Sequence, residues 1–401
     1  MFLILLSIAA ICLSLFIGIY GLYFLLVFRN PKRRDYLALV ETAFMRELPL
    51  DQLPNVSILV PAHNEEEAVS GKLRNIAAMN YPSEKIEIIL IDDCSDDKTA
   101  EVAGHVLNEL SLNGKTITNS ERLGVNASYN KGVAESRGDL ILTTDADVTI
   151  DKDTLIKAVK VLNSFAEVGG VTGKMIPVSN DVTSAALIEK SYRGLYDSTS
   201  TLESAIHSTF PGYTGFLLMK KSAFSPLPVN CGSSDGNISL SIIRKGLRFL
   251  SIPGISFYEP ISLRVDEQRR QKVRRAARLT QSVFANKDML FKSRYESFGS
   301  TIFPLRFAMM IFAPILFFIG VTATACAVLC VSVPLCLSLT FVFLLSVYSG
   351  AKMALHKLNI FSSFVIHQLY LLVGLFFSQK EVTTWRSANR SEMVEKLQKT
   401  S

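Results

Sequence analysis

Long apolar runs at both ends of the chain enclose a middle part in which apolar and polar residues alternate. Residues 1–28 contain no charged residue, and residues 301–350 contain one, Arg306. A helix needs about 20 apolar residues to cross a bilayer. The pattern therefore predicts one span at 1–28 and two further spans at 303–326 and 328–347, with Pro314 and Pro334 tolerated as kinks.

The N-terminal run has the features of an uncleaved anchor rather than of a signal peptide. It lacks a basic segment before the apolar residues and a small-residue cleavage site, and it is long for a signal peptide. Basic residues follow it directly, as on the cytoplasmic side of a membrane helix: Arg29, Lys32, Arg33 and Arg34. We expect the next segment to be cytoplasmic.

A third apolar stretch, 358–379, leaves the membrane topology open. It is uncharged but contains His367 and Gln368, so it is compatible with a span or with a re-entrant or interfacial helix. If every apolar stretch crossed the bilayer, the tail 380–401 would lie outside, although its basic residues resemble a cytoplasmic segment. We favour the re-entrant or interfacial alternative. Trp385, the single tryptophan, is expected at the membrane interface.

Short apolar strands alternate with amphipathic helices between residues 51 and 300. Strands are predicted at 56–60, 86–91 and 140–142, and helices at 65–79 and 97–110. This alternation is typical of a parallel α/β sheet, in which ligands bind beyond the carboxyl ends of the strands. Each strand is followed there by polar residues: His63, Asn64 and Glu65, then Asp92 and Asp93, then Asp145 and Asp147.

The composition agrees with a soluble domain attached to membrane helices. Apolar residues make up 49% of the chain and the mean hydropathy is +0.29, which is too apolar for an entirely soluble enzyme. The 42 basic and 36 acidic residues nevertheless require an aqueous part, and so much apolar sequence excludes disorder. Six cysteines without a CxxC pair indicate neither a disulfide framework nor a zinc site. The net charge of +6 favours anionic partners.

Three motifs at the predicted sheet edge, 60–65, 91–99 and 144–147, resemble in order and spacing the nucleotide-sugar-binding half of family 2 glycosyltransferases. The resemblance covers roughly 56–280 and, with the flanking spans, is similar to the membrane-embedded cellulose, chitin and hyaluronan synthases. It implies the GT-A fold, an α/β domain with a Rossmann-like mixed sheet, together with transmembrane helices. The predicted parts are an anchor 1–28, a juxtamembrane linker 29–50, a cytoplasmic catalytic domain 51–262, a basic amphipathic interfacial segment 263–300, C-terminal transmembrane or re-entrant helices 301–379, and a basic tail 380–401.

The resemblance also implies roles for the residues at the sheet edge. Asp147 is expected to bind Mg²⁺ or Mn²⁺ and Asp145 to contact the nucleoside or sugar, and a position at the end of a strand would point both carboxylates to one side. Asp93 is expected to contact the nucleoside base. Pro61, His63, Asn64 and Glu65 are expected to line the nucleotide.

Each of these positions has an alternative role. The pair Asp145 and Asp147 is also compatible with a solvated turn before a helix, and Asp92 and Asp93 with turn residues. Glu65 is compatible with a first-turn helix acid. We assign Asp96 as a helix N-cap.

The segment 122–132 resembles the part of the family that wraps the diphosphate. Val125 stands where a lysine is usual, and Lys131 or Arg122 is expected to replace that lysine. Asp235, next to Ser234 where the family has a glutamate, falls on the position of the general base. The alternative is that Asp235, Ser233 or Ser234 caps the helix that follows.

Gln271 and Arg274 match the family's Gln-x-x-Arg element, with Arg275 at the position of its tryptophan. The resemblance implies that this element neutralises the leaving diphosphate. The alternative is a basic amphipathic helix on anionic lipid, and we expect lipid contacts of the flanking arginines: Arg264, Arg269, Arg270 and Arg278. Tyr213 and Gly215 are candidate acceptor contacts, although Tyr213 and Phe216 are equally compatible with the core.

Together these features predict a metal-dependent, inverting glycosyltransferase in the cell membrane, with several spans and a cytoplasmic catalytic domain. It is expected to move one hexose, mannose or glucose, from a nucleoside diphosphate sugar to a lipid-linked glycan acceptor. The alternatives are a processive polysaccharide synthase and a non-catalytic nucleotide-sugar-binding membrane subunit. Nucleic acid is not an expected partner, because the basic stretch lacks interleaved aromatic residues.

Overall fold

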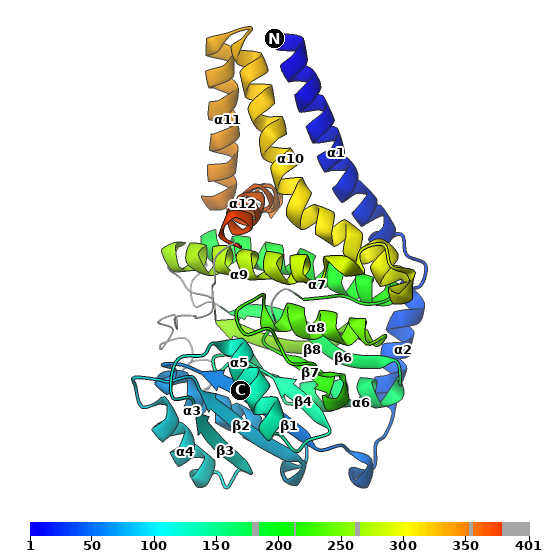
Figure 1. Ribbon diagram of the computed structural model, residues 1–401, viewed down its shortest axis with the longest axis vertical. Coiled ribbons are helices and arrows are strands. Elements are labelled where there is room, and N and C mark those ends of the chain that lie inside the picture. The colour runs from blue at the N-terminus through cyan, green and yellow to red at the C-terminus, as the bar shows by residue number, and fades with distance from the viewer. Residues whose placement is uncertain (179–183, 212–213, 261–264, 353–355, 379–401) are drawn as a thin grey trace.

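The computed structural model (Figure 1) describes residues 1–178, 184–211, 214–260, 265–352 and 356–378. Three positions with predicted roles, Tyr213, Arg264 and Trp385, lie outside the described residues, as does the tail 380–401.

An eight-stranded mixed sheet in the order β3-β2-β1-β4-β7-β6-β8-β5 forms the centre of the soluble part. The strands β3, β2, β1 and β4 are parallel, whereas β7 runs antiparallel to both β4 and β6. The predicted Rossmann-like mixed sheet is thus confirmed. The strands are β1 Val56–Ala62, β2 Ile86–Asp92, β3 Gly114–Thr118, β4 Leu140–Thr143, β5 Thr149–Ile150, β6 Val168–Val178, β7 Leu217–Lys220 and β8 Arg248–Pro260.

The strand β1 continues through Pro61, where the sequence predicted its end. Proline has no N–H to donate to a neighbouring strand, so it is disfavoured inside a sheet. The ladder between β1 and β4 reaches only from Val56 to Leu59, so Pro61 removes no hydrogen bond to β4. The strand can therefore extend two residues further.

Helices cover both faces of the sheet (Figure 1). One core packs α2 Arg33–Met45, α3 Glu66–Ala77, α4 Thr99–Glu109 and α6 Thr154–Ser164 against residues such as Ile58 and Val60. The second core, on the other face of the sheet, packs α5 Val125–Glu135, α8 Ser234–Arg244 and α9 Val265–Ala285 against the strand residues that point to that face, such as Leu59. Successive strand residues point to opposite faces, which explains the continuous apolar runs. Short turns of helix lie at Leu50–Gln52, Ser83–Lys85, Lys221–Ala223, Lys287–Met289, Ser293–Tyr295 and, as a π-helix, Phe298–Ile302.

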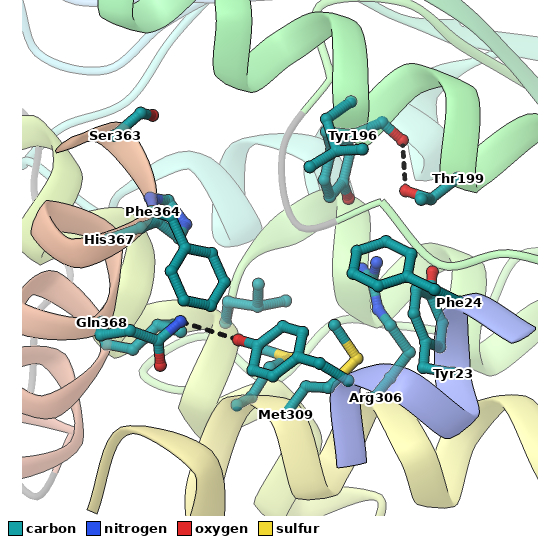
Figure 2. Close-up of a pocket in the computed structure, with 15 residues that line it drawn as sticks. Tyr23, Phe24, Tyr196, Thr199, Arg306, Met309, Ser363, Phe364, His367 and Gln368 are labelled. Carbon is teal, nitrogen blue, oxygen red and sulfur yellow. Dashed lines mark hydrogen bonds between the residues drawn. The ribbon is translucent and has the colours of Figure 1, made fainter. Parts of the chain in front are cut away.

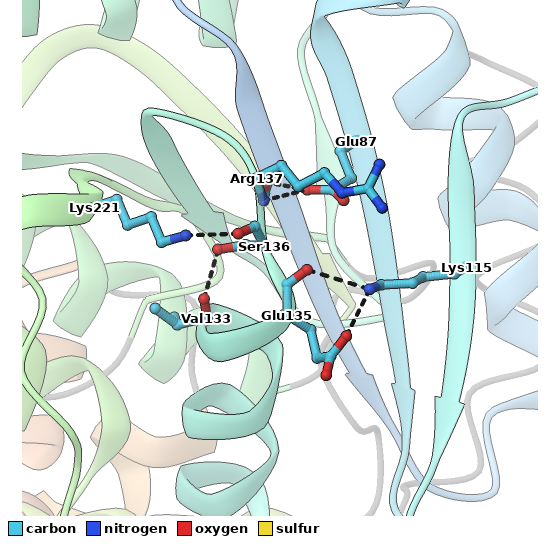
Figure 3. Close-up of polar contacts among 8 residues, drawn as sticks. Glu87, Lys115, Val133, Glu135, Ser136, Arg137 and Lys221 are labelled. Atoms are coloured by element: carbon cyan, nitrogen blue, oxygen red, sulfur yellow. Dashed lines mark hydrogen bonds and ion pairs between the residues drawn. The ribbon is translucent and has the colours of Figure 1, made fainter.

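The helix α5 is fastened at its C-terminal end, away from the carboxyl edge of the sheet (Figure 3). Lys115 on β3 donates to the carboxylate of Glu135 at 2.8 Å, and Lys221 donates to the carbonyl of Ser136 at 2.6 Å. The amide of Arg137 donates to Glu87 on β2 at 2.8 Å. These contacts hold the end of α5 against the parallel half of the sheet.

The segment 29–50, predicted as a linker, contains the helix α2, which is docked on the domain that contains the sheet. Tyr36, Val40 and Ala43 are buried in the first core, and the Tyr36 hydroxyl donates to the Ser251 carbonyl at 2.8 Å. The connection from the anchor to the domain is therefore a packed helix rather than an extended linker.

Four apolar helices complete the chain: α1 Phe2–Phe28, α10 Phe303–Leu329, α11 Val333–Lys352 and α12 His356–Phe377. Within the described residues, Phe2–Phe28 and Phe298–Leu329 are long and apolar enough to cross a membrane, and α11 and α12 contain shorter apolar segments. Only 11% of the most apolar window of α1 is buried, unlike a core helix of a soluble protein. Pro314 lies inside α10, whereas Pro334 lies in the first turn of α11, where proline starts a helix rather than kinking it.

The helices α1, α10 and α11 extend away from the sheet along the long axis of the molecule (Figure 1). The helix α12 is seen nearly end-on at the base of α11, next to α9, and its main contacts are with α9 and α11. It therefore crosses the direction of the other three. This orientation agrees with the re-entrant or interfacial alternative for 358–379.

A buried polar cluster joins the apolar helices to the catalytic domain. Glu203 on α7 Ser184–Ile206 is fully buried, and its carboxylate lies 3.7 Å from the Arg306 guanidinium on α10. The Tyr23 hydroxyl on α1 and the Thr209 hydroxyl donate to the same carboxylate at 2.7 and 2.5 Å. One acidic side chain thus connects two apolar helices with the domain.

Candidate active site

The loops that follow β1 and β2 are bound to one another at the carboxyl edge of the sheet. The Asn64 side chain accepts from the amide of Asp96 at 2.9 Å, and the Asn64 amide donates to the Ser95 hydroxyl at 3.0 Å. The His63 ring lies 3.0 Å from the Asp93 carbonyl. Asn64 and Cys94 both have left-handed backbones, with φ of 55° and 58°, which the paired loops hold in place. His63 and Asn64 therefore shape this edge.

The predicted N-cap at Asp96 is wrong. The helix α4 begins at Thr99, and it is the carboxylate of Asp97 that accepts from the Thr99 amide, at 2.9 Å. Asp96 instead contributes its own amide to the bond with Asn64. The helix starts two residues later than the sequence pattern indicated, so Lys98 is the N-cap residue, without a side-chain bond, and Asp97 before it accepts from the first amide of the helix.

Asp93 is fully buried and organises the segment that leads into α5. Its carboxylate accepts from the amides of Leu123 and Gly124 and from the Asn119 side chain, each at 2.9 Å. Lys131 donates to the same Asn119 at 3.0 Å. The structure thus brings Asp93 and Lys131 together through Asn119. These bonds use three of the roughly four acceptor sites of the carboxylate, which leaves one site on Asp93 Oδ2.

Asp145 and Asp147 lie in the turn between β4 and β5, both half-buried. The expectation that strand pleating orients them is wrong, because β4 ends at Thr143. Lys72 on α3 holds this turn from both sides: its ammonium donates to the Thr144 hydroxyl at 2.7 Å and to the Val148 carbonyl at 2.8 Å.

Lys72 is a residue that the sequence reasoning missed. Its side chain is buried, and burial lowers its pKa to about 7, with the charge of Asp145 opposing that shift. A signal was present in the sequence, because Lys72 occupies an apolar position of α3, between the buried Val69 and Ile76. A charged residue at such a position indicates a buried polar partner.

Thr214 and Gly215 connect the Asp145–Asp147 turn with Asp235. A Cβ on Gly215 would come within 2.5 Å of the Val148 side chain, so glycine permits this close packing. The adjacent Thr214 amide donates to the Asp235 carboxylate at 3.0 Å. Phe216 is fully buried in the first core, in agreement with its alternative role.

Asp235 is buried at the start of α8 and does not cap it. The Ser233 hydroxyl is the cap and accepts from the Gly236 amide at 3.2 Å, as one of the alternatives anticipated. Burial and then the charge of Asp145 raise the pKa of Asp235 to about 7, against the effects of the Thr214 amide, Arg278 and Arg275. The structure therefore brings Asp145 and Asp235 close enough to interact electrostatically.

The helix α9 passes over this site. Arg278 is buried and donates to the Gly232 carbonyl at 2.9 Å, so its predicted lipid contact is wrong: it faces the start of α8 instead. Arg275, at the position of the family's tryptophan, forms an ion pair of 3.0 Å with Glu259 on β8. Gln271 lies one helical turn before Arg275, and Arg274 lies one turn before Arg278. Both are half-buried and on the same face of α9 as these arginines. Arg269 and Arg270 are exposed.

The half-buried carboxylates of Asp145 and Asp147 are compatible with a divalent cation. Mg²⁺ is usually held by one or two carboxylates together with substrate phosphates, rather than by a protein cage. Within the described residues, no group of three His, Cys, Asp or Glu side chains forms such a cage.

Comparison with known proteins places this geometry in a family. Residues 57–225 match the profile of glycosyl transferase family 2. The chain is 34% identical over 138 residues to the "Probable glycosyltransferase YdaM" of Bacillus subtilis (strain 168). This alignment covers 33% of this chain and 33% of that protein. It is 30% identical over 182 residues to the poly-β-1,6-N-acetyl-D-glucosamine synthase of Staphylococcus aureus (strain COL), which covers 44% and 42%. The matches thus span less than half of these relatives' length.

Among solved structures, the mannosyltransferase PcManGT from Pyrobaculum calidifontis, in complex with GDP-Man and Mn²⁺, has a similar fold. The TM-score is 0.74 at 21% sequence identity, and the superposition covers 93% of this chain and 99% of that one. The likeness extends beyond the sheet domain, although identity at this level shows the fold alone. Residues 57–225 therefore form a family 2 glycosyltransferase domain, and the fold of the chain is of the GT-A type seen in the similar mannosyltransferase.

Proposed function

We propose that the protein is a membrane-bound inverting glycosyltransferase that transfers one hexose from a nucleoside diphosphate sugar to a lipid-linked acceptor. The observation that carries this proposal is Asp235: a buried carboxylate with a pKa of about 7, held by the Thr214 amide and close to Asp145. A general base works best when its pKa lies near the working pH. A purely structural aspartate in a solvated turn would not need this environment.

In the proposed reaction, the Asp235 carboxylate takes the proton from an acceptor hydroxyl. The acceptor oxygen forms a bond to the anomeric carbon from the face opposite the nucleotide, while the bond from that carbon to the diphosphate oxygen breaks. The configuration inverts and the nucleoside diphosphate leaves. The cationic face of α9, which includes Arg274 and Arg278, stabilises the charge that develops on the diphosphate.

The donor site is proposed to lie along the ends of β1, β2 and β4. Pro61, His63, Asn64 and Glu65 line the nucleotide, Asp93 contacts the nucleoside base, Lys131 contacts the diphosphate, and Asp145 contacts the nucleoside or sugar. Asp147 would hold Mn²⁺ or Mg²⁺, which supplies positive charge to the diphosphate when bound. The GDP-Man and Mn²⁺ named for the similar mannosyltransferase support mannose as the sugar and a divalent cation as the cofactor.

The arrangement of the apolar helices supports a topology with three crossings. The N-terminus and the turn between α10 and α11 lie at the end of the molecule far from the sheet (Figure 1). If α1, α10 and α11 cross and α12 lies at the interface, the catalytic domain and the basic tail 380–401 are both on the cytoplasmic side of the cell membrane. The positive-inside rule then holds throughout.

A processive polysaccharide synthase is the second candidate. It is favoured by the similarity to the poly-β-1,6-N-acetyl-D-glucosamine synthase. A polymerising enzyme must hold a growing glycan, for which aromatic side chains are well suited. At the position where the family has a tryptophan, this chain has Arg275, whose ion pair with Glu259 makes it a structural residue. Single addition is therefore preferred.

The purified full-length protein is expected to be stabilised by GDP-mannose in the presence of Mn²⁺. A ligand at 100 times its Kd stabilises the native state by about 2.7 kcal/mol, so the melting temperature should rise measurably. UDP-glucose and UDP-N-acetylglucosamine serve as competing donors, and removal of Mn²⁺ with EDTA should reduce the shift. Incubation with an isoprenyl-phosphate-linked sugar should then yield one product, larger by one sugar. A ladder of products would establish the processive alternative, and stabilisation by no donor would refute the proposal.

Replacing Lys72 with methionine is expected to lower kcat by about 10-fold. Methionine fills the apolar space of the lysine stem but loses both bonds that position the Asp145–Asp147 turn, and small misplacements of reacting groups are costly. The Mn²⁺ concentration for half-maximal activity should rise, which a loss of stability alone would not cause. The matched control is Arg74→Met, on the exposed side of α3 in an ion pair with Glu109. An unchanged Mn²⁺ dependence in Lys72→Met would limit Lys72 to a structural role.

A further inference from the structure

A cavity of about 230 Å³ lies where the apolar helices meet the catalytic domain (Figure 2). Residues of α1, α7, α9, α10 and α12 line it. It therefore lies between the apolar helices α1, α10 and α12 and the helices α7 and α9 of the domain that contains the sheet. The lining is mostly apolar and includes Phe24, Leu279, Met309, Phe364 and Leu371. Its volume is below the 300–1,000 Å³ that is typical of small-molecule pockets, so it can hold only part of a larger ligand.

Two polar atoms of the residues that line this cavity lack a hydrogen-bond partner, Nε of Arg306 and the amide oxygen of Gln368. Gln368 on α12 is 1% exposed, its amide nitrogen donates to the Tyr20 hydroxyl at 2.7 Å, and its amide oxygen accepts no hydrogen bond. Reversing the amide would satisfy the oxygen and leave the nitrogen without an acceptor. A buried polar atom without a partner is unfavourable, and such atoms in native structures often mark a ligand site. The side chain is drawn at the cavity wall in Figure 2.

The cavity carries little net charge. Arg306 lines it, but the Glu203 carboxylate lies 3.7 Å from the guanidinium and offsets its charge. An anionic head group would gain little from this neutralised pair. The apolar walls favour an uncharged hydrocarbon chain. The unsatisfied amide of Gln368 favours a chain that ends in a hydroxyl, which can donate to the amide oxygen, or in another oxygen, which can accept from the amide nitrogen when the amide is reversed.

The cavity is connected to the proposed base through the second core. Arg306 donates to the Phe210 carbonyl at 3.5 Å. Phe210 is buried in the same core as Ile238 of α8, the helix that has Asp235 in its first turn. A lipid chain in the cavity would therefore lie on the side of the sheet that carries Asp235.

We propose that this cavity binds the hydrocarbon chain of the lipid-linked acceptor next to its head group, with the polar end of the chain at Gln368. The inference rests on the proposed function, because it assigns a site to the acceptor of that reaction. The chain enters from the bilayer between α1 and α12, and the sugar to be extended lies at the carboxyl edge of the sheet. An isoprenyl phosphate and a glycerolipid share the hydrocarbon chain, and the charged phosphate of an isoprenyl phosphate would lie outside the cavity, towards the sheet.

The test compares Leu371→Trp, which fills the cavity, with Leu369→Trp, a control on the same helix whose side chain is 47% exposed and outside the cavity. Each full-length variant is assayed with one sugar presented on an isoprenyl phosphate, on diacylglycerol or without a lipid. We expect the KM for the lipid-linked sugar to rise by about 10-fold in Leu371→Trp, because part of the buried chain is excluded, and to stay unchanged in Leu369→Trp. The lipid whose KM responds identifies the natural type of chain.

Gln368→Leu provides a second variant that keeps the size of the side chain. It should raise the same KM without changing the thermal stabilisation by donor. If the wild type transfers sugar to lipid and both cavity variants keep its KM, the cavity site is refuted while the proposed function stands. If the wild type uses only the acceptor without lipid, the lipid-acceptor proposal itself fails, and the cavity proposal with it.

Discussion

Replacing Asp235 with asparagine is expected to lower the rate of sugar transfer by about 10²–10⁴-fold, the usual contribution of a general base. The amide cannot take a proton from the acceptor, yet it keeps the size of the side chain and can still accept from the Thr214 amide. The loss should appear in kcat at saturating donor and acceptor. Donor-dependent thermal stabilisation should remain, because Asp235 is not assigned to the nucleotide.

The same residue determines the expected pH dependence. Burial and the charge of Asp145 raise the pKa of Asp235 to about 7, and only the deprotonated carboxylate can act as the base. The wild-type rate should therefore fall about tenfold per pH unit below pH 7 and level off above it. In Asp235→Asn this inflection should disappear from the residual rate.

A matched control separates the loss of the base from a general effect of removing an aspartate. Asp288→Asn changes an exposed aspartate that pairs with Arg244, and it should keep the wild-type rate. If Asp235→Asn kept a rate within about threefold of the wild type, another group would have to serve as the base. If the wild-type protein bound the donor but transferred no sugar under any condition, the alternative of a non-catalytic nucleotide-sugar-binding subunit would be favoured.

Replacing Glu203 with glutamine is expected to destabilise the protein by about 3–5 kcal/mol, because it leaves the buried Arg306 without a counter-charge. Glutamine also replaces one of the two carboxylate oxygens with an NH2 group. The hydroxyl that donates to that oxygen, of Tyr23 or of Thr209, would then lose its acceptor. For a domain of this size the loss corresponds to a fall in Tm of about 10 °C. Thermal unfolding of the detergent-solubilised full-length protein measures it.

The control for this variant is Glu296→Gln. Glu296 is 76% exposed and lies 3.6 Å from His207, so neutralising it should change Tm by no more than about 2 °C. If the Tm of Glu203→Gln also lay within about 2 °C of the wild-type Tm, the cluster of Glu203, Arg306 and Tyr23 would not be what holds the apolar helices to the domain.

Local patterns predicted the parts of the site that follow directly from strands and helices. The strands 56–60, 86–91 and 140–142 appear at nearly the predicted positions, and parallel pairing brings their carboxyl ends to one edge. The helix after Asp235 was also predicted, and the structure places this residue at its first turn. Such features depend on the periodicity of a few neighbouring residues.

Local patterns were less informative where a side chain has partners far away in the sequence. Asp96 is a good helix cap by residue type, but α4 begins at Thr99, so Lys98 is at the N-cap position and Asp97 accepts from the first amide of the helix. Arg278 resembles the exposed Arg269 and Arg270 in the sequence, but it is buried because its turn of α9 lies over Gly232. Whether a residue on such a helix is buried depends on which other element packs against its side of the helix.

The sequence by itself therefore determined the family resemblance, the mixed α/β sheet, the acidic residues at its edge and the apolar helices that flank it. Only the tertiary structure placed Lys72 between Thr144 and Val148, joined Glu203 to Arg306 across about 100 residues, and laid α12 across the other apolar helices. The physical reason is that burial and charge pairing are properties of neighbours in space. Hydrophobic periodicity, in contrast, is a property of neighbours in the chain.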